Sequence, residues 1–149
     1  MADKITTISP ITNQPIIVRP EATEPELARL VDVAQKAFKT WSKTTLSERL
    51  EIVNKALKHL SEQQDEYGKQ ITEMMGRPIA YTAKEVSTAV MRGEYLVKIS
   101  ESALADTPGE EEAGFKRLIR KMPVGPVLIL FPWNVCIPSP ITLHIVSSY

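Results

Sequence analysis

Apolar residues recur at three- and four-residue spacings over two long stretches of the chain, a pattern that predicts amphipathic helices. The first stripe consists of Leu27, Leu30, Val31, Ala34, Phe38 and Trp41. The second stripe consists of Leu46, Leu50, Val53, Leu57 and Leu60, a spacing that suits close helix–helix packing. A threonine precedes each stripe and a glutamate follows it three residues later, at Thr23 and Glu26 and again at Thr45 and Glu48. This is the capping-box signature of a helix start, so we expect one helix on each stripe.

Two further helices are predicted downstream. Helical character over residues 67–75 ends at Gly76, with Pro78 just beyond it, as is common at helix C-termini. A longer helix is predicted over residues 81–104. Its inward-facing residues are expected to be Val86, Val90, Leu96, Val97 and Leu104.

The first twenty residues predict a β-hairpin. β-Branched residues cluster in residues 5–9 and 16–19 on either side of a proline-rich turn. Asn13 lies in this turn and tolerates a left-handed backbone, which favours a tight reversal of the chain.

The pattern changes after residue 105. Residues 106–114 are acidic and rich in turn formers, which predicts a solvated connection. Residues 115–122 predict an exposed strand with four basic side chains. Residues 127–131 are apolar at every position, which predicts a strand covered on both faces, as in a parallel sheet. Pro132, Trp133 and Asn134 follow this strand directly, and the carboxyl ends of such strands form the crevice where cofactor and substrate bind in open α/β sheets.

Composition excludes several classes of function. The 18 basic and 18 acidic residues balance and form no basic patch, so we expect no nucleic-acid partner. Cys136 is the one cysteine and there are two histidines, which rules out an internal disulfide and predicts no metal site. The apolar stretch 124–146 contains four prolines and is not expected to span a membrane. The first residues lack the apolar core of a secretory signal, so we expect a cytoplasmic protein.

The sequence resembles the NAD(P)-dependent aldehyde dehydrogenases. Residues 120–127 (RKMPVGPV) followed by 131–134 (FPWN) are similar to the start of the cofactor domain in that family. Upstream segments match in the same order, at residues 9–16, 34–41, 48–49 and 72–78, with Asn13 where glycine is common. The resemblance covers residues 5–134. It implies an α/β fragment in which an N-terminal β-hairpin and helical arm lead into the first strands of an incomplete Rossmann-like nucleotide domain.

The resemblance also implies roles for individual residues. In the complete enzyme, which oxidises an aldehyde substrate to a carboxylate with NAD or NADP, Asn134 would bind the oxyanion formed when a cysteine thiolate attacks the carbonyl. An amide held by a rigid Pro-Trp turn suits developing negative charge. Leu130, Phe131, Pro132 and Trp133 match positions that line the nicotinamide site.

The family's nucleophilic cysteine, its glutamate base and its adenosine-binding lysine all match positions beyond residue 149. Cys136 comes too early to be that nucleophile, and only His144 is near enough in sequence to act as its base. We therefore expect a truncated aldehyde dehydrogenase that is inactive and binds no cofactor by itself.

The predicted organisation has three parts: a hairpin and helical arm over residues 1–114, the start of a nucleotide-binding domain over 115–134, and an atypical tail over 135–149. Pro138 and Pro140 break the helix that the family has after the asparagine. One hypothesis for this departure is a retained intron, since Val135-Cys136 can be encoded by GTATGT, and a genuine short product is the alternative.

Two other functions remain open. The helical arm is also consistent with a non-catalytic interaction module that pairs with an intact aldehyde dehydrogenase paralogue through an unsatisfied apolar face. A four-helix domain unrelated to the family, with Trp133 as a core aromatic, is the third reading. With its apolar surface exposed, the isolated chain is expected to be marginally stable or partly molten.

Overall fold

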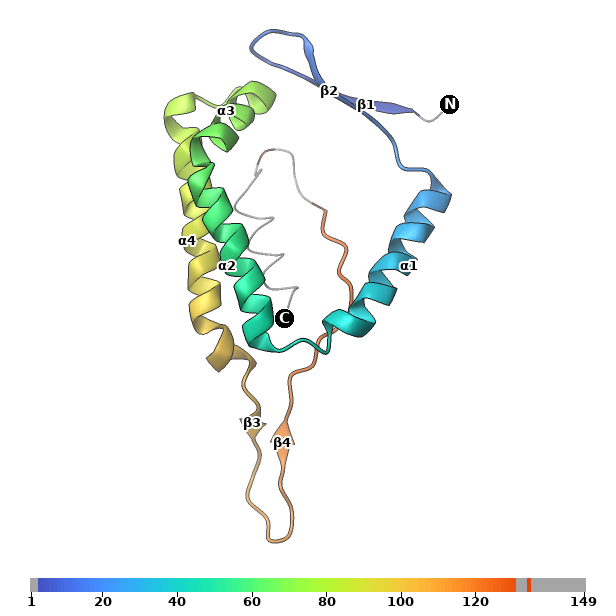
Figure 1. The fold of residues 1–149 in the computed structure, drawn as a ribbon, viewed down its shortest axis with the longest axis vertical. Helices are drawn as coiled ribbons and strands as arrows, with labels where there is room; N and C mark the ends of the chain where they lie inside the picture. The colour runs from blue at the N-terminus through green and yellow to red at the C-terminus, as the bar shows by residue number, and fades with distance from the viewer. Residues whose placement is uncertain (1–2, 131–133, 135–149) are drawn as a thin grey trace.

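The computed structural model describes residues 3–130 and residue 134. The described elements, in chain order, are β1 (Lys4–Ile8), β2 (Pro15–Pro20), α1 (Glu24–Trp41), α2 (Leu46–Glu62), α3 (Gln64–Met75), α4 (Ile79–Leu104), β3 (Thr107–Pro108) and β4 (Leu118–Ile119). Helices α2, α3 and α4 lie together on one side of the molecule and α1 lies on the other (Figure 1). The β3–β4 hairpin projects away from the helices.

The N-terminal hairpin forms as predicted. Strands β1 and β2 pair antiparallel, with an irregularity between Thr7 and Ile8. Asn13 has φ 56°, the left-handed backbone expected of it. The hydroxyl of Ser9 is buried and accepts hydrogen bonds from the backbone N–H groups of Ile11 and Thr12, at 3.3 and 3.4 Å. One side chain therefore satisfies two backbone donors in the turn.

Both predicted capping boxes are present. The backbone N–H of Thr45 donates to Glu48 Oε2 at 2.7 Å, and the N–H of Glu48 donates back to the hydroxyl of Thr45 at 3.2 Å. At the start of α1, the backbone N–H of Thr23 donates to Glu26 Oε2 at 2.8 Å. These hydrogen bonds from the threonine backbone favour the charged carboxylates and lower the pKa of both glutamates. The two helices therefore begin where local sequence predicts.

The core lies between α4 and the two helices before it. Helix α3 packs most extensively against α4, and α2 packs against the same helix. The buried apolar residues are Leu57, Ile71, Val86, Ala89 and Val90. Val53, Leu60, Leu96 and Val97 pack against Leu57 and Val90, which confirms the inward faces predicted for α2 and α4.

A glycine allows α3 and α4 to approach closely. A Cβ added at Gly68 would lie 3.0 Å from the backbone nitrogen of Ala83 and 3.1 Å from the hydroxyl of Thr82. Helix α3 then ends at Gly76, whose φ of 75° places it in the left-handed region, as predicted for this position. The α3–α4 packing thus depends on one missing side chain and one left-handed residue.

Helix α1 has an apolar stripe but no buried residue. Its residues Leu27, Leu30 and Val31 are 52%, 51% and 56% exposed. The predicted stripe is therefore present, but it is only partly covered.

The prediction of a buried strand over residues 127–131 is wrong for residues 127–130, the part of this run that the structure describes. Residues 127–130 form no strand, and Leu128 and Leu130 are 86% and 85% exposed. Nor does the described part of the chain contain any other strand of a Rossmann-like sheet. A parallel strand needs neighbouring strands for its hydrogen bonds and helices over both faces, and residues 3–130 supply neither to this segment.

The predicted strand over residues 115–122 is reduced to the two residues of β4, although its side chains are exposed as expected. The predicted division after residue 114 falls inside the β3–β4 hairpin and stays a prediction.

A charged pair links the start of α4 to the turn before it. Nη1 of Arg77 donates to Oε2 of Glu85. The side chain of Glu85 is only 8% exposed and that of Arg77 is 40% exposed. Among the described residues, Oε1 of Glu85 has no hydrogen-bond partner. The carboxylate therefore depends on a single cation.

Replacing Arg77 with alanine is expected to destabilise the helical core by about 1–3 kcal/mol, because it leaves a buried carboxylate unpaired. The loss falls short of the roughly 3–5 kcal/mol for a fully buried pair because Arg77 is partly exposed. The free energy of unfolding in urea, followed by circular dichroism, is the measurement. Lys58→Ala is the matched control: it breaks a 3.8 Å pair with Glu62 that is largely exposed, and we expect a cost below about 1 kcal/mol. Equal costs for the two variants would contradict the prediction.

Candidate functional site

The predicted site lies after the β3–β4 hairpin in the sequence. Ion pairs between its acidic and basic side chains stabilise this hairpin. Nε and Nη2 of Arg120 donate to Asp106 Oδ2 at 3.2 and 3.0 Å. These bonds and the charge of Asp106 raise the pKa of Arg120. Arg117 forms an ion pair with Glu112, and its carbonyl accepts from the N–H of Gly109 at 3.0 Å. The acidic loop is exposed as predicted, but two of its carboxylates pair with the basic segment that follows.

The chain after the hairpin is anchored to the end of α4. The ammonium group of Lys121 donates to the carbonyl of Ala103, one of the last carbonyls of α4. A hollow of about 350 Å³ lies at this junction. Its lining consists of Leu46, Arg49, Glu101, Leu104, Ala105, Lys121 and Pro123. This anchor fixes where residues 122–130 leave the helices.

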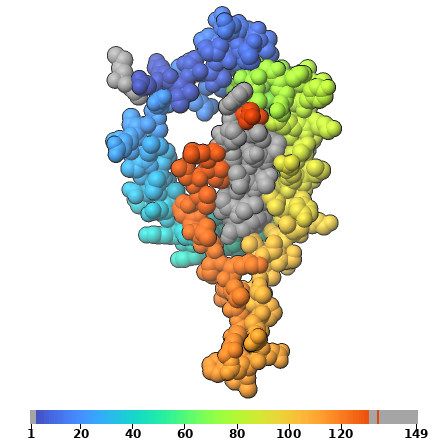
Figure 2. All heavy atoms as spheres, turned by 180° about the vertical axis from the view of Figure 1, so that it is seen from behind, coloured from blue at the N-terminus to red at the C-terminus, as the bar shows by residue number. Residues whose placement is uncertain are grey.

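The structure places only two of the predicted site residues. Leu130 is 85% exposed, and Asn134 is exposed in a turn. Phe131, Pro132 and Trp133 lie outside the described residues, as do Cys136 and His144. In Figure 2, residues 122–130 lie at the molecular surface that faces the viewer. No contact between Leu130 and Asn134 is established, so their joint role stays a prediction.

Leu130 and Asn134, the two described members of the predicted site, carry an apolar side chain and an amide. The exposed apolar side chain of Leu130 can contact a flat ring, and the exposed amide of Asn134 can donate a hydrogen bond. Residues 122–130 contain no basic side chain for the cofactor phosphates. The rest of such a site would have to come from other residues.

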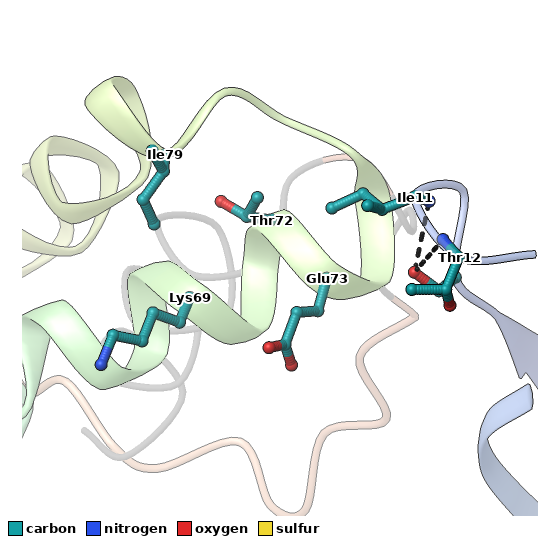
Figure 3. Close-up of a pocket in the computed structure, with 7 residues that line it drawn as sticks. Ile11, Thr12, Lys69, Thr72, Glu73 and Ile79 are labelled. Carbon is teal, nitrogen blue, oxygen red and sulfur yellow. Dashed lines mark hydrogen bonds between the residues drawn. The ribbon is translucent and has the colours of Figure 1, made fainter. Parts of the chain in front are cut away.

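A second hollow lies where the tip of the N-terminal hairpin meets α3 (Figure 3). It measures about 330 Å³ and is lined by Ser9, Ile11, Thr12, Lys69, Thr72, Glu73 and Ile79. The hydroxyl of Ser9 is engaged by the turn, and that of Thr72 donates to the carbonyl of Gly68 at 3.2 Å. Lys69 and Glu73 point in different directions (Figure 3). The hollow therefore presents no converging set of catalytic groups.

Within residues 3–130 and 134, no group of three or more potential ligands could hold a metal ion. His59 is exposed, as expected, and its Nε2 lies 3.2 Å from the hydroxyl of Tyr67. None of the described helices is both long enough and apolar enough to cross a membrane.

Comparison with known proteins places the chain in a family. The sequence model of the aldehyde dehydrogenase family matches residues 1–144, and the chain belongs to this family. The resemblance predicted from residues 5–134 is thereby confirmed.

Individual relatives match over a limited part of their own length. The chain is 32% identical over 127 residues to 3-succinoylsemialdehyde-pyridine dehydrogenase of a Pseudomonas species, covering 85% of this chain and 26% of the relative. It is 25% identical over 126 residues to glutarate-semialdehyde dehydrogenase of Pseudomonas putida, with the same two coverages. The chain thus spans about a quarter of the length of these relatives.

Solved structures share the fold. Succinic semialdehyde dehydrogenase of Streptococcus pyogenes, solved in complex with NADP+, has a TM-score of 0.86 at 24% identity, covering 95% of this chain and 31% of that one. PnpE in complex with nicotinamide adenine dinucleotide has a TM-score of 0.90 at 20% identity, covering 98% of this chain and 30% of that one. Similarity at this level of identity establishes the fold of the matched part.

Proposed function

We propose that this chain supplies the N-terminal portion of an NAD(P)-dependent aldehyde dehydrogenase. The main support is the family match over residues 1–144, which includes the Pro-Trp-Asn segment. In the proposed reaction an aldehyde, water and NAD(P)+ give a carboxylate, NAD(P)H and two protons. The cofactor, when bound, accepts the hydride.

The proposed contribution of this chain is one side of the active site. The side-chain N–H of Asn134 would donate to the aldehyde oxygen as it gains negative charge. Leu130, Phe131, Pro132 and Trp133 would line the nicotinamide site. Residues 3–130 contain no cysteine, so these residues cannot supply the nucleophile. We therefore propose that the chain is inactive when no further residues are supplied.

A chimera tests this function. Residues 1–134 are fused to the part of 3-succinoylsemialdehyde-pyridine dehydrogenase that lies beyond its match to this chain. We expect aldehyde-dependent reduction of NAD or NADP by the chimera, measured by the absorbance of the reduced cofactor, and none by the 149-residue chain. The same chimera with its downstream cysteines replaced by alanine is the control. A folded chimera that reduces neither cofactor, or hydride transfer by the short chain, would contradict the proposal.

A second candidate function is a non-catalytic module that pairs with another aldehyde dehydrogenase chain, in the simplest case an intact paralogue. The exposed apolar residues of α1 and of residues 122–130 favour it. Co-expression of the tagged chain with an intact relative, followed by purification on the tag, tests this pairing.

A further inference from the structure

Helix α4 ends without a cation of its own. Its last turn contains no basic residue, and Ala105, which follows it, has φ −57° and ψ 146° instead of the left-handed conformation that closes many helices. The last four carbonyl groups of a helix have no partner within the helix, and the negative end of the helix dipole lies there. The end of α4 therefore favours a cation from another part of the chain.

Lys121 supplies this cation from the chain that follows the β3–β4 hairpin. Its ammonium group donates to the carbonyl of Ala103, which lies in the last turn of α4. The residue before it, Arg120, binds the carboxylate of Asp106, two residues beyond the end of α4. Two consecutive basic side chains thus tie the returning chain to the end of the helix.

Lys121 is the last of these ties before the proposed site. Among the described residues, no hydrogen bond or ion pair reaches residues 122–130. Pro123 lines the same hollow as Lys121, next to the ends of α2 and α4. Beyond this junction, the direction of the described chain depends on the anchor and on the backbone that follows it.

The backbone that follows Lys121 is partly rigid. The rings of Pro123 and Pro126 hold their own φ angles at about −65°. Gly125 turns the chain between them with φ 119°, a conformation that glycine adopts without strain. Because two of the five residues after Lys121 cannot rotate about φ, a displacement at Lys121 carries over to the residues that follow.

We propose that Lys121 is a positioning residue for Asn134. This inference rests on the function proposed above, in which the amide of Asn134 donates to the aldehyde oxygen. Lys121 contacts neither the aldehyde nor the cofactor in this proposal. By binding the last turn of α4, it fixes the point from which residues 122–134 extend. A catalytic group misplaced by about 1 Å can cost about 100-fold in rate, so a distant anchor affects catalysis.

Kinetics of the chimera test this role. Lys121→Met keeps a long, unbranched side chain and removes the ammonium donors. We expect kcat to fall at least about tenfold and the KM for the aldehyde to change less than about threefold, since the amide acts mainly in the transition state. Lys121→Arg retains a donating cation and should keep most of the activity. Lys116→Met removes an exposed lysine of the same basic segment and should leave kcat unchanged.

A double-mutant cycle tests whether Lys121 acts through Asn134. Once Asn134→Ala has removed the amide, Lys121→Met should lower kcat by less than about twofold more, because coupled positions are not additive. Urea unfolding of the same variants separates this role from a stabilising one. A merely stabilising lysine would lower the unfolding midpoint and leave kcat of the folded chimera unchanged.

Hydrogen exchange of the 149-residue chain provides a test of the anchor that does not depend on catalysis. Lys121→Met should speed the exchange of backbone amides in the last turn of α4 at least about threefold, because the end of the helix opens more often. Lys116→Met should leave this exchange unchanged. Mass spectrometry of peptides from this turn measures both variants.

Three outcomes would overturn the inference. One is an active chimera in which Lys121→Met keeps kcat within about threefold of its original value. Another is a loss of kcat that is the same with and without the amide of Asn134. The third is a Lys121→Arg variant as slow as Lys121→Met. A folded chimera that is inactive before any substitution contradicts the proposed function instead, and the exchange measurement then shows separately whether Lys121 anchors the end of α4.

Discussion

Replacing Asn134 with alanine in the chimera is expected to lower kcat by about 100- to 1000-fold and to change KM much less. In the proposed reaction the amide of Asn134 binds an oxygen whose negative charge develops only during reaction. An interaction made mainly in the transition state lowers kcat and kcat/KM together when it is removed. Steady-state kinetics with the aldehyde and with each cofactor provide the measurement.

Three further variants sharpen this prediction. Asn134→Asp replaces the amide donor with a carboxylate, which repels the oxyanion, so we expect a loss at least as large as with alanine. Asn134→Gln retains the amide on a longer side chain, and part of the activity should survive. Asn54→Ala removes an exposed amide on α2 and is the control. If Asn134→Ala retains kcat within about threefold, the amide is not the oxyanion donor.

The helical part of this fold could be predicted because its determinants are local. The capping boxes at Thr45 and Thr23 each act over three residues, and Gly76 ends α3 through its own backbone conformation. The apolar stripe of α2 includes the buried Leu57, since one covered face is what a 3.6-residue period encodes. Because these signals act within a few residues, they can be interpreted without the rest of the sequence.

The predictions that failed or fell short depend on distant groups. The run over residues 127–131 is apolar enough for a buried strand, but a strand is stabilised by neighbours that its own sequence does not specify. The Arg120–Asp106 pair joins residues 14 positions apart and was missed. Opposite charges in adjacent segments, with Asp106 and Glu112 before Arg117 and Arg120, are the sequence signal that could have indicated it.

The candidate site is the part that the sequence predicts least well in physical terms. The resemblance assigned roles to Asn134 and Leu130, but a binding site also requires the surfaces that face them. An apolar stripe such as that of α1 tells which side of a helix avoids water and does not tell what covers it. The same limit explains why the stripe of α2 includes a buried residue whereas the stripe of α1 is only partly covered.

A buried apolar residue and a half-exposed one are expected to respond differently to truncation. Replacing Ile71 with alanine is expected to destabilise the chain by about 2–5 kcal/mol, because the side chain is 2% exposed and its removal leaves a cavity in the packed core. Leu30→Ala in α1, at a position 51% exposed, is expected to cost far less in the same chain. Urea unfolding followed by circular dichroism measures both costs.

Because domains are stabilised by only about 5–15 kcal/mol, Ile71→Ala can unfold a small core outright. Ile71→Val removes a single methylene group and is expected to cost about 0.5–1.5 kcal/mol, so it provides a measurable value if the alanine variant does not fold. In the chimera, where further residues are present, the cost of Leu30→Ala should rise toward that of a buried leucine. A Leu30→Ala cost that equals that of Ile71→Ala in the short chain would mean that the α1 stripe is already covered there. A cost that is small in both contexts would mean that nothing covers the stripe in the longer protein either.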